Sequence, residues 1–208
     1  MRKIFVIENL TLDGVMQAPG RPDEDTRGGF KHGGWALSYN DEVMMREMMG
    51  GGMGQTDLLF GRRTYEDFYG FWPKQTNPNP FTEVLNNTRK YVVSTTLTDS
   101  LPWANSTLLA GDGVAALTKL KQQPGNDLVI LGSGVLVQSL MRHTLIDVYR
   151  LSIHPLVLGS GRHLFLHGDT AFTTLRLTHA VTTTTGVVIA TYEPAKPTNP
   201  AGKGVSHV

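Results

Sequence analysis

The chain has 208 residues, of which 40% are hydrophobic and 18% charged, and its formal net charge is +1. This composition is typical of a globular protein with one large domain or two small ones. The near-neutral charge argues against nucleic acid or an anionic membrane surface as a partner. The absence of cysteine excludes disulfides, thiolate metal sites and a cysteine nucleophile, and no metal site is expected.

The N-terminal apolar run is too short for a signal peptide, and no apolar segment is long enough to span a membrane. Together with the lack of cysteine, this predicts a cytoplasmic protein. We expect a small molecule as its partner, with no nucleic acid and no membrane.

Short apolar runs bounded by glycine, proline or charged residues predict the strands of a sheet, and continuous runs are typical of strands buried on both faces. The expected strands are residues 3–8, 57–60, 90–94, 108–109, 128–131 and 148–154, followed by a C-terminal antiparallel pair at 172–180 and 181–192. Helices are expected after Asn40 or Asp41, over residues 113–121 and from Val135 onward. The order strand, glycine turn, helix, strand over 127–154 indicates a parallel βαβ unit.

These elements predict one α/β domain over residues 1–195, with a mostly parallel central sheet, flanking helices and an antiparallel C-terminal edge. Residues 17–34 are rich in glycine, proline and charge and predict a long flexible loop. Residues 70–82 are expected to form a proline-rich surface connection. Residues 196–208 have no apolar pattern and predict a disordered tail.

Three predicted strands end in groups suited to phosphate, at residues 61–64, 94–96 and 132–135. Each stretch can also be explained without a ligand, as a tight turn that requires glycine or polar residues. In that case Arg62 and Arg63 are solvated surface charges. Because ligands bind at the carboxyl ends of the strands in an open α/β sheet, the three ends together predict a site for an elongated phosphorylated ligand such as a dinucleotide.

Several of these segments resemble a known family. FGRRTYE resembles the GRxTxE segment of dihydrofolate reductases. LDG, GSGVLVQSLM and DVYRLSIHPLVLGSGRHLF resemble the reductase domain of the riboflavin-biosynthesis deaminase–reductase. The combination with GGW, FWP and KYVVSTTL is most similar to stand-alone bacterial proteins with a RibD C-terminal domain, over residues 3–193. The resemblance implies a dihydrofolate reductase-like fold.

The resemblance also implies NADPH as the cofactor. The residues expected at the pyrophosphate and adenosine phosphates are Gly61, Arg62, Arg63 and Thr64, with Ser94 and Thr95 near the 2′-phosphate. Those expected on the other side of the pyrophosphate are Gly132, Ser133, Gly134, Val135 and Leu136. Thr11, Asp13 and Gly14 are expected to border the nicotinamide.

The catalytic candidates are Asp13 and Asp41, either of which would position the substrate or relay a proton. By its spacing from Trp35, Asp41 is the nearest candidate for the carboxylate that holds the pterin in dihydrofolate reductases, and its alternative role is to cap the helix. Residues 17–34 are expected to cover the substrate as a lid. No role is assigned to His32 or His154.

The predicted function is an NADPH-dependent reductase of a small heterocyclic or sugar-linked substrate, similar to 5-amino-6-(5-phosphoribosylamino)uracil reductase of riboflavin biosynthesis. The chain lacks the motifs of the zinc deaminase domain, so it would not catalyse the preceding deamination. A true dihydrofolate reductase and a non-catalytic NADPH-binding module are the alternatives. The resemblance further implies a homodimer.

Overall fold

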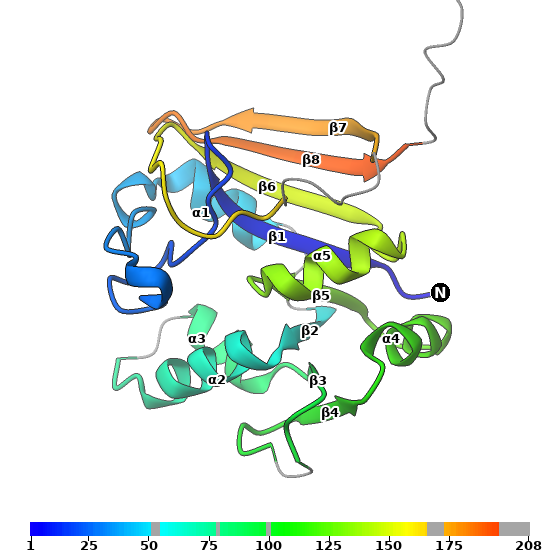
Figure 1. The fold of residues 1–208 in the computed structure, drawn as a ribbon. Helices are drawn as coiled ribbons and strands as arrows, with labels where there is room; N and C mark the ends of the chain where they lie inside the picture. The colour runs from blue at the N-terminus through cyan, green and yellow to red at the C-terminus, as the bar shows by residue number, and fades with distance from the viewer. Residues whose placement is uncertain (51–54, 78–79, 99–100, 166–172, 196–208) are drawn as a thin grey trace, which may run out of the picture.

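The computed structural model describes residues 1–50, 55–77, 80–98, 101–165 and 173–195, in which eight strands form one sheet. The strands are β1 (Ile4–Thr11), β2 (Thr56–Gly61), β3 (Lys90–Ser94), β4 (Ser106–Ala110), β5 (Asp127–Leu131), β6 (Val148–His154), β7 (Leu175–Thr182) and β8 (Val188–Pro194). The α-helices are α1 (Glu42–Gly50), α2 (Arg62–Phe71), α3 (Pro80–Asn87), α4 (Gly113–Gln122) and α5 (Gly134–Arg142) (Figure 1).

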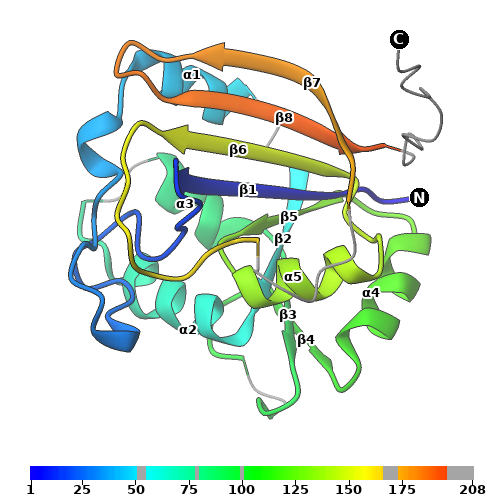
Figure 2. The same cartoon turned by 45° about the horizontal axis from the view of Figure 1, so that its top comes forward.

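The sheet has the strand order β4-β3-β2-β5-β1-β6-β8-β7. All neighbours from β4 to β6 pair in parallel, whereas β8 is antiparallel to β6 and β7 is antiparallel to β8. The predicted mostly parallel sheet with an antiparallel C-terminal edge is therefore confirmed. In Figure 2 the carboxyl ends of β1 and β6 lie on the left, beside the loops that follow these strands.

Helices cover both faces of the sheet because the strands of its parallel part are apolar on both sides. Leu59 of β2 packs in a cluster with Leu117 of α4 and Val137 of α5. Its neighbour Leu58 points to the opposite face and packs with Tyr65 of α2. This alternation has the period of two that a strand imposes on its side chains. Helix α3 packs on the same face as α2 through Leu85, and α1 packs over the antiparallel edge of the sheet through Met44.

The prediction of a surface connection over residues 70–82 is wrong at both ends. Helix α2 continues to Phe71 and is followed by a 3-10 turn (Trp72–Lys74), and α3 begins at Pro80. Proline is well suited to a first helical position, where its missing N–H would have no intrahelical partner. Phe81 and Leu85 then pack on the core beside α2, so tertiary contacts support a helix that proline and asparagine obscured.

The predicted boundary within the C-terminal hairpin is also wrong, because Val181 belongs to β7 and β8 begins only at Val188. The N–H of Thr183 donates to the carbonyl of Val187 at 2.8 Å and closes the turn between the two strands. Gly186 has a φ of 85°, which favours glycine and explains the turn at this place. Residue 172, where the first strand was predicted to start, and the predicted tail at 196–208 lie outside the described residues.

Candidate functional site

The predicted ligand-binding stretches follow four neighbouring parallel strands, in the order β3, β2, β5 and β1. Their carboxyl ends therefore lie along one edge of the sheet, where adjacent strands are about 4.8 Å apart. The structure thus places residues 94–95, 61–64 and 132–136 in one row. Residues 11–14 lie further out at the same edge, because β1 continues from Ile7, which pairs with Leu131, to Thr11. This is the place where open α/β sheets bind their ligands.

At the centre of this row, the ends of β2 and β5 are joined directly. The N–H of Gly61 donates to Oγ of Ser133 at 3.0 Å. A Cβ on Gly132 would lie 3.3 Å from Cγ2 of Thr64, and a Cβ on Gly61 would lie 3.8 Å from Cβ of Leu136. The first turns of α2 and α5 consequently start side by side.

The backbone before α5 has an unusual conformation, since Gly132 and Ser133 both have positive φ, at 66° and 65°. Ser133 is the N-cap residue of α5, but its side chain makes no cap hydrogen bond with that helix. Gly61, the N-cap of α2, has no side chain to donate or accept. Neither helix therefore has a side-chain cap on its first N–H groups, and adjacent free helix N-termini favour an anion such as a pyrophosphate.

The two arginines after Gly61 are both accessible to solvent. Arg63 is exposed, and Arg62 is 41% exposed and forms an ion pair with Glu66 at 3.7 Å within α2. Val135, in the first turn of α5, is 71% exposed. The predicted phosphate-binding groups at these positions are thus accessible to a ligand.

Ser94 and Thr95 at the end of β3 are placed differently from each other. Ser94 is buried, and its Oγ accepts hydrogen bonds from the N–H groups of Thr96 and Leu97 at 3.1 and 3.0 Å. Thr95 is exposed. Ser94 therefore shapes the turn after β3, while Thr95 presents its side chain to solvent.

After β1, Thr11 and Asp13 hold the turn that contains Gly14. The Thr11 hydroxyl donates to the Asp13 carboxylate and accepts from the N–H of Val15 at 2.9 Å. The other carboxylate oxygen of Asp13 accepts from the N–H of Gly159 at 2.8 Å. Burial acts to raise the pKa of Asp13, but the hydrogen bonds from Thr11, Gly159 and Leu158 lower it below its ordinary value. Asp13 is thus an ionised group that orients two loops.

Asp41 caps α1, as the second of its two predicted roles required. Its Oδ1 accepts from the N–H of Met44 at 2.8 Å. Its Oδ2 accepts from the N–H and the hydroxyl of Thr184 at 2.7 and 2.6 Å, in the turn between β7 and β8. The hydrogen bond from the Thr184 side chain is the main cause that lowers the pKa of Asp41 to about 2. Both oxygens are therefore engaged within the protein.

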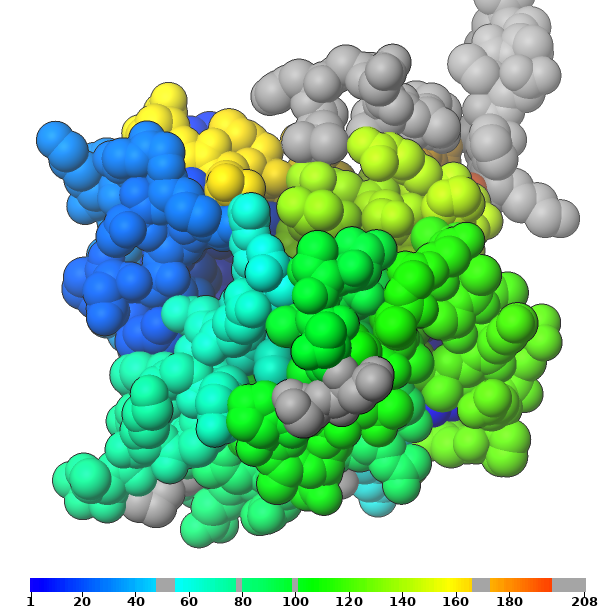
Figure 3. All heavy atoms as spheres, turned by 60° about the horizontal axis from the view of Figure 1, so that its bottom comes forward, coloured from blue at the N-terminus to red at the C-terminus, as the bar shows by residue number. Residues whose placement is uncertain are grey.

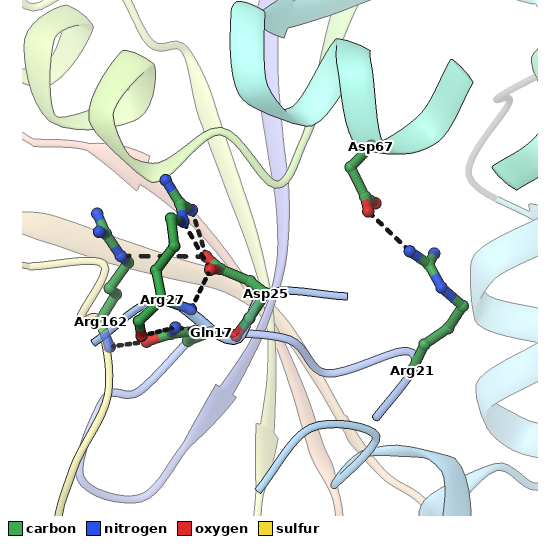
Figure 4. Close-up of polar contacts among 6 residues, drawn as sticks. All are labelled: Gln17, Arg21, Asp25, Arg27, Asp67 and Arg162. Atoms are coloured by element: carbon green, nitrogen blue, oxygen red, sulfur yellow. Dashed lines mark hydrogen bonds and ion pairs between the residues drawn. The ribbon is translucent and has the colours of Figure 1, made fainter. Parts of the chain in front are cut away.

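The loop over residues 17–34, predicted as a lid, is attached to two other elements (Figure 4). Arg21 donates to Asp67 of α2 at 2.7 Å. Gln17 is buried, and its Oε1 accepts from the N–H of Arg162 at 3.0 Å in the loop after β6. Asp25 pairs with Arg27 in the same loop. In the space-filling view the surfaces of residues 17–40 (blue) and of α2 (cyan) face each other across a hollow (Figure 3).

Two buried polar groups lie near this edge: Glu8, which the sequence analysis missed, and His154, to which it assigned no role. Glu8 of β1 is 4% exposed and shares its strand face with the core residues Val6 and Leu10. Burial, and then the carboxylate of Glu24, raise the pKa of Glu8 well above its ordinary value. His154, at the end of β6, is 1% exposed. The sequence feature that could have identified Glu8 is an acidic residue at a strand position whose side chain faces the core.

The chain matches the family model of the RibD C-terminal domain over residues 2–189, and it belongs to this family. It is 30% identical over 139 residues to the uncharacterized protein YyaP of Bacillus subtilis, which covers 65% of this chain and 72% of YyaP.

The fold is similar to those of two solved structures. A putative riboflavin biosynthesis protein from Shewanella has a TM-score of 0.68 at 22% identity, covering 93% of this chain and 99% of that one. Dihydrofolate reductase from Enterococcus faecalis, complexed with NADP(H) and RAB-propyl, has a TM-score of 0.55 at 15% identity, covering 93% and 97%. The predicted dihydrofolate reductase-like fold is therefore confirmed.

Two kinds of feature are absent from the described residues. No group of three or more histidine or acidic side chains there is arranged to hold a metal ion. Within the same ranges, no helix has the length and apolar character needed to cross a membrane.

Proposed function

We propose that this protein is an NADPH-dependent reductase of a small heterocyclic or sugar-linked substrate, similar to 5-amino-6-(5-phosphoribosylamino)uracil reductase. The observation that carries the proposal is the junction where Ser133 Oγ joins the N-terminal ends of α2 and α5. Membership of the RibD C-terminal domain family supports the reductase class. The NADP(H) bound to the Enterococcus faecalis reductase, which has a similar fold, supports the choice of cofactor.

The residues at the junction fit a dinucleotide. The uncapped first turns of α2 and α5 offer N–H groups and positive dipole ends to the pyrophosphate. Both positions require glycine, because Gly132 has a positive φ and a Cβ on Gly134 would lie 2.5 Å from Sδ of Met16. The guanidinium groups of Arg62 and Arg63 would pair with the adenosine phosphates, and the Thr95 hydroxyl would lie beside them.

When bound, NADPH supplies a hydride to a C=N or C=O carbon of the substrate. The protein contributes position and the exclusion of water. Thr11 and Asp13 hold the turn at Gly14, which would border the nicotinamide, and Asp13 also holds the loop at Gly159. Because Asp13 stays ionised and its oxygens accept protein hydrogen bonds, we propose that it positions this turn and does not donate a proton. The loop at residues 17–34, tied to α2 through Arg21, would cover the substrate.

A true dihydrofolate reductase is less well supported by the site. Such an enzyme needs a carboxylate on or beside its first helix that is free to hold the pterin. Here Asp41 is bonded to Met44 and Thr184, and Glu47 of α1 accepts from Arg150 at 2.9 Å. Asp41 and Glu47 are committed to contacts within the protein, and Glu42 in the first turn of α1 is exposed to solvent. None of the three is a buried carboxylate that could hold a pterin, which favours a reductase of the RibD type.

The test is a titration of the purified protein with NADPH and with NADH, followed by quenching of tryptophan fluorescence. We expect NADPH to bind more tightly than NADH, and we expect Arg62→Ala and Arg63→Ala each to weaken NADPH binding by about tenfold through loss of a phosphate contact. The matched control is Arg142→Ala, because Arg142 is exposed at the opposite end of α5, about 12 Å from Gly134.

The outcomes separate the alternatives. If neither nucleotide binds, the reductase proposal fails and only the fold remains. Tight NADPH binding without oxidation across a panel of pterins and pyrimidines would instead indicate a non-catalytic binding module. Oxidation of NADPH with one substrate, seen as loss of its absorbance, would establish the enzyme.

A further inference from the structure

His154, at the carboxyl end of β6, is a buried histidine with one unpartnered ring nitrogen. Its Nε2 lies 3.1 Å from Oδ1 of Asn9 on the neighbouring strand β1. Its Nδ1 is buried and has no hydrogen-bond partner among the described residues. The rings of Trp35 and Tyr39 pack edge-on against the imidazole, with centroid distances of 5.1 and 5.2 Å. The imidazole is therefore held in one orientation.

The hydrogen-bond balance determines which nitrogen carries the proton. Burial lowers the pKa of His154 to about 4, so the ring is neutral at pH 7 and has one donor and one acceptor. If Nε2 is the donor, it bonds to Oδ1 of Asn9, and Nδ1 is left as a buried acceptor. The other tautomer would bury an unpaired N–H, which costs more than an unpaired lone pair. His154 thus donates to Asn9, and the Nδ2 amino group of Asn9 points away from His154.

Asn9 presents this amino group on a partly exposed strand face. Phe5, Ile7 and Asn9 alternate along β1, share one face and are each partly exposed. This face lies between α1, which packs over β6 and β8, and the cluster formed by α2 and α3 over β2 and β3, and Phe5 and Ile7 line the edge of that cluster with part of their surface exposed. No described residue accepts a hydrogen bond from Nδ2 of Asn9. The strand face is therefore apolar, with one free donor next to the turn that begins at Thr11.

We propose that Asn9 is a specificity-determining residue that donates from Nδ2 to a ring carbonyl oxygen of the substrate, and that His154 is the positioning residue that fixes the orientation of this amide. The chemistry of the substrate follows from this strand face. Phe5 and Ile7 suit a flat ring, and the donor at Nδ2 of Asn9 requires a hydrogen-bond acceptor on that ring. A ring amino group at the same position would meet another donor. This inference rests on the proposed function and narrows its substrate to oxo-substituted heterocycles.

The test compares two probes that differ at one position, 6-methylpterin with a 4-oxo group and 2,4-diamino-6-methylpteridine with a 4-amino group. Dissociation constants are measured by fluorescence on the full chain saturated with NADPH. Wild type is expected to bind the oxo probe at least about tenfold more tightly. Asn9→Asp replaces the outward donor by an acceptor of the same size, so the preference should reverse. His154→Phe keeps a ring but removes the donor, so the preference should fall to within about twofold.

Two controls make the result specific. Asn40→Asp adds the same charge at an exposed position next to Tyr39 and should leave the preference unchanged. NADPH affinity and thermal melting of each variant report whether it folds, and Asn9→Asp carries the test if His154→Phe does not fold.

The inference is overturned if Asn9→Asp leaves the ratio of the two dissociation constants unchanged, or if folded wild type binds neither probe at millimolar concentration. Loss of the preference in His154→Phe alone, with Asn9→Asp unchanged, would also overturn it, because the effect would not pass through Asn9. A different result would separate this inference from the proposed function. If NADPH does not bind, and Asn9→Asp still reverses the probe preference when no cofactor is present, the proposed function is overturned and Asn9 keeps its assigned role.

Discussion

Replacing Glu8 by glutamine removes a buried ionisable group while keeping its shape. Glu8 is 4% exposed, and its Oε1 has no hydrogen-bond partner among the described residues. Burial is the main cause that raises its pKa well above 4.5, and the carboxylate of Glu24 adds to it. The folded protein therefore favours the neutral acid, and glutamine is a permanent substitute for that form.

The pH dependence of stability follows from the direction of this shift. In the unfolded chain Glu8 loses its proton near pH 4.5, whereas in the folded protein it keeps the proton to a higher pH. Its contribution to stability is thus fully present below pH 4.5 and is lost as the pH rises through the raised pKa. Over that window the free energy of unfolding of wild type falls relative to Glu8→Gln by up to about 1.4 kcal/mol per pH unit, the slope for one proton.

The assay is urea denaturation of wild type and Glu8→Gln between pH 5 and 8, followed by tryptophan fluorescence. We expect the variant to gain stability over wild type as the pH rises above 5, until the pH has passed the raised pKa of Glu8. Glu83→Gln is the matched control, because Glu83 is exposed on α3 and should show a difference that does not grow with pH. A difference between wild type and Glu8→Gln that stays constant from pH 5 to 8 would refute the reasoning.

Three further predictions concern stability and assembly. The Asp57 carboxylate is 4% exposed and pairs with Arg2 at 2.5 Å. Arg2→Met leaves this carboxylate buried without its cation, so the free energy of unfolding measured in urea should fall by about 3–5 kcal/mol. A fall of less than about 1 kcal/mol would contradict this. Asp41→Asn should lower the melting temperature at neutral pH by weakening the bonds to Thr184, and the deficit should shrink as the pH falls from 3.8 toward about 2, where wild type also loses its charge. The homodimer stays a prediction; β7 is an exposed edge strand suited to pairing, and light scattering that gives the mass of a monomer would remove it.

Local pattern was sufficient for most of the parallel sheet. The boundaries of β3 and β6 agree with the predicted strands, and the turn from β5 into α5 lies where the glycines indicated. Continuous apolar runs leave few alternatives to a strand buried on both faces. The helix α3 was missed because prolines and asparagines dominate its start, and the packing of Phe81 and Leu85 against distant residues compensates for them.

For the candidate site, the sequence by itself identified the kinds of residues at each strand end, because glycine, hydroxyl and guanidinium groups have the same local chemistry in any fold. Only the tertiary structure decided their order along the edge, since the β2–β5 pairing brings Gly61 to Ser133, 72 residues away. It also decided which groups are already engaged, such as Asp41, and which are oriented for a ligand, such as Asn9. The partner of Asn9 lies 145 residues away, and the pairing of β1 with β6 brings the two together; no local pattern carries that information.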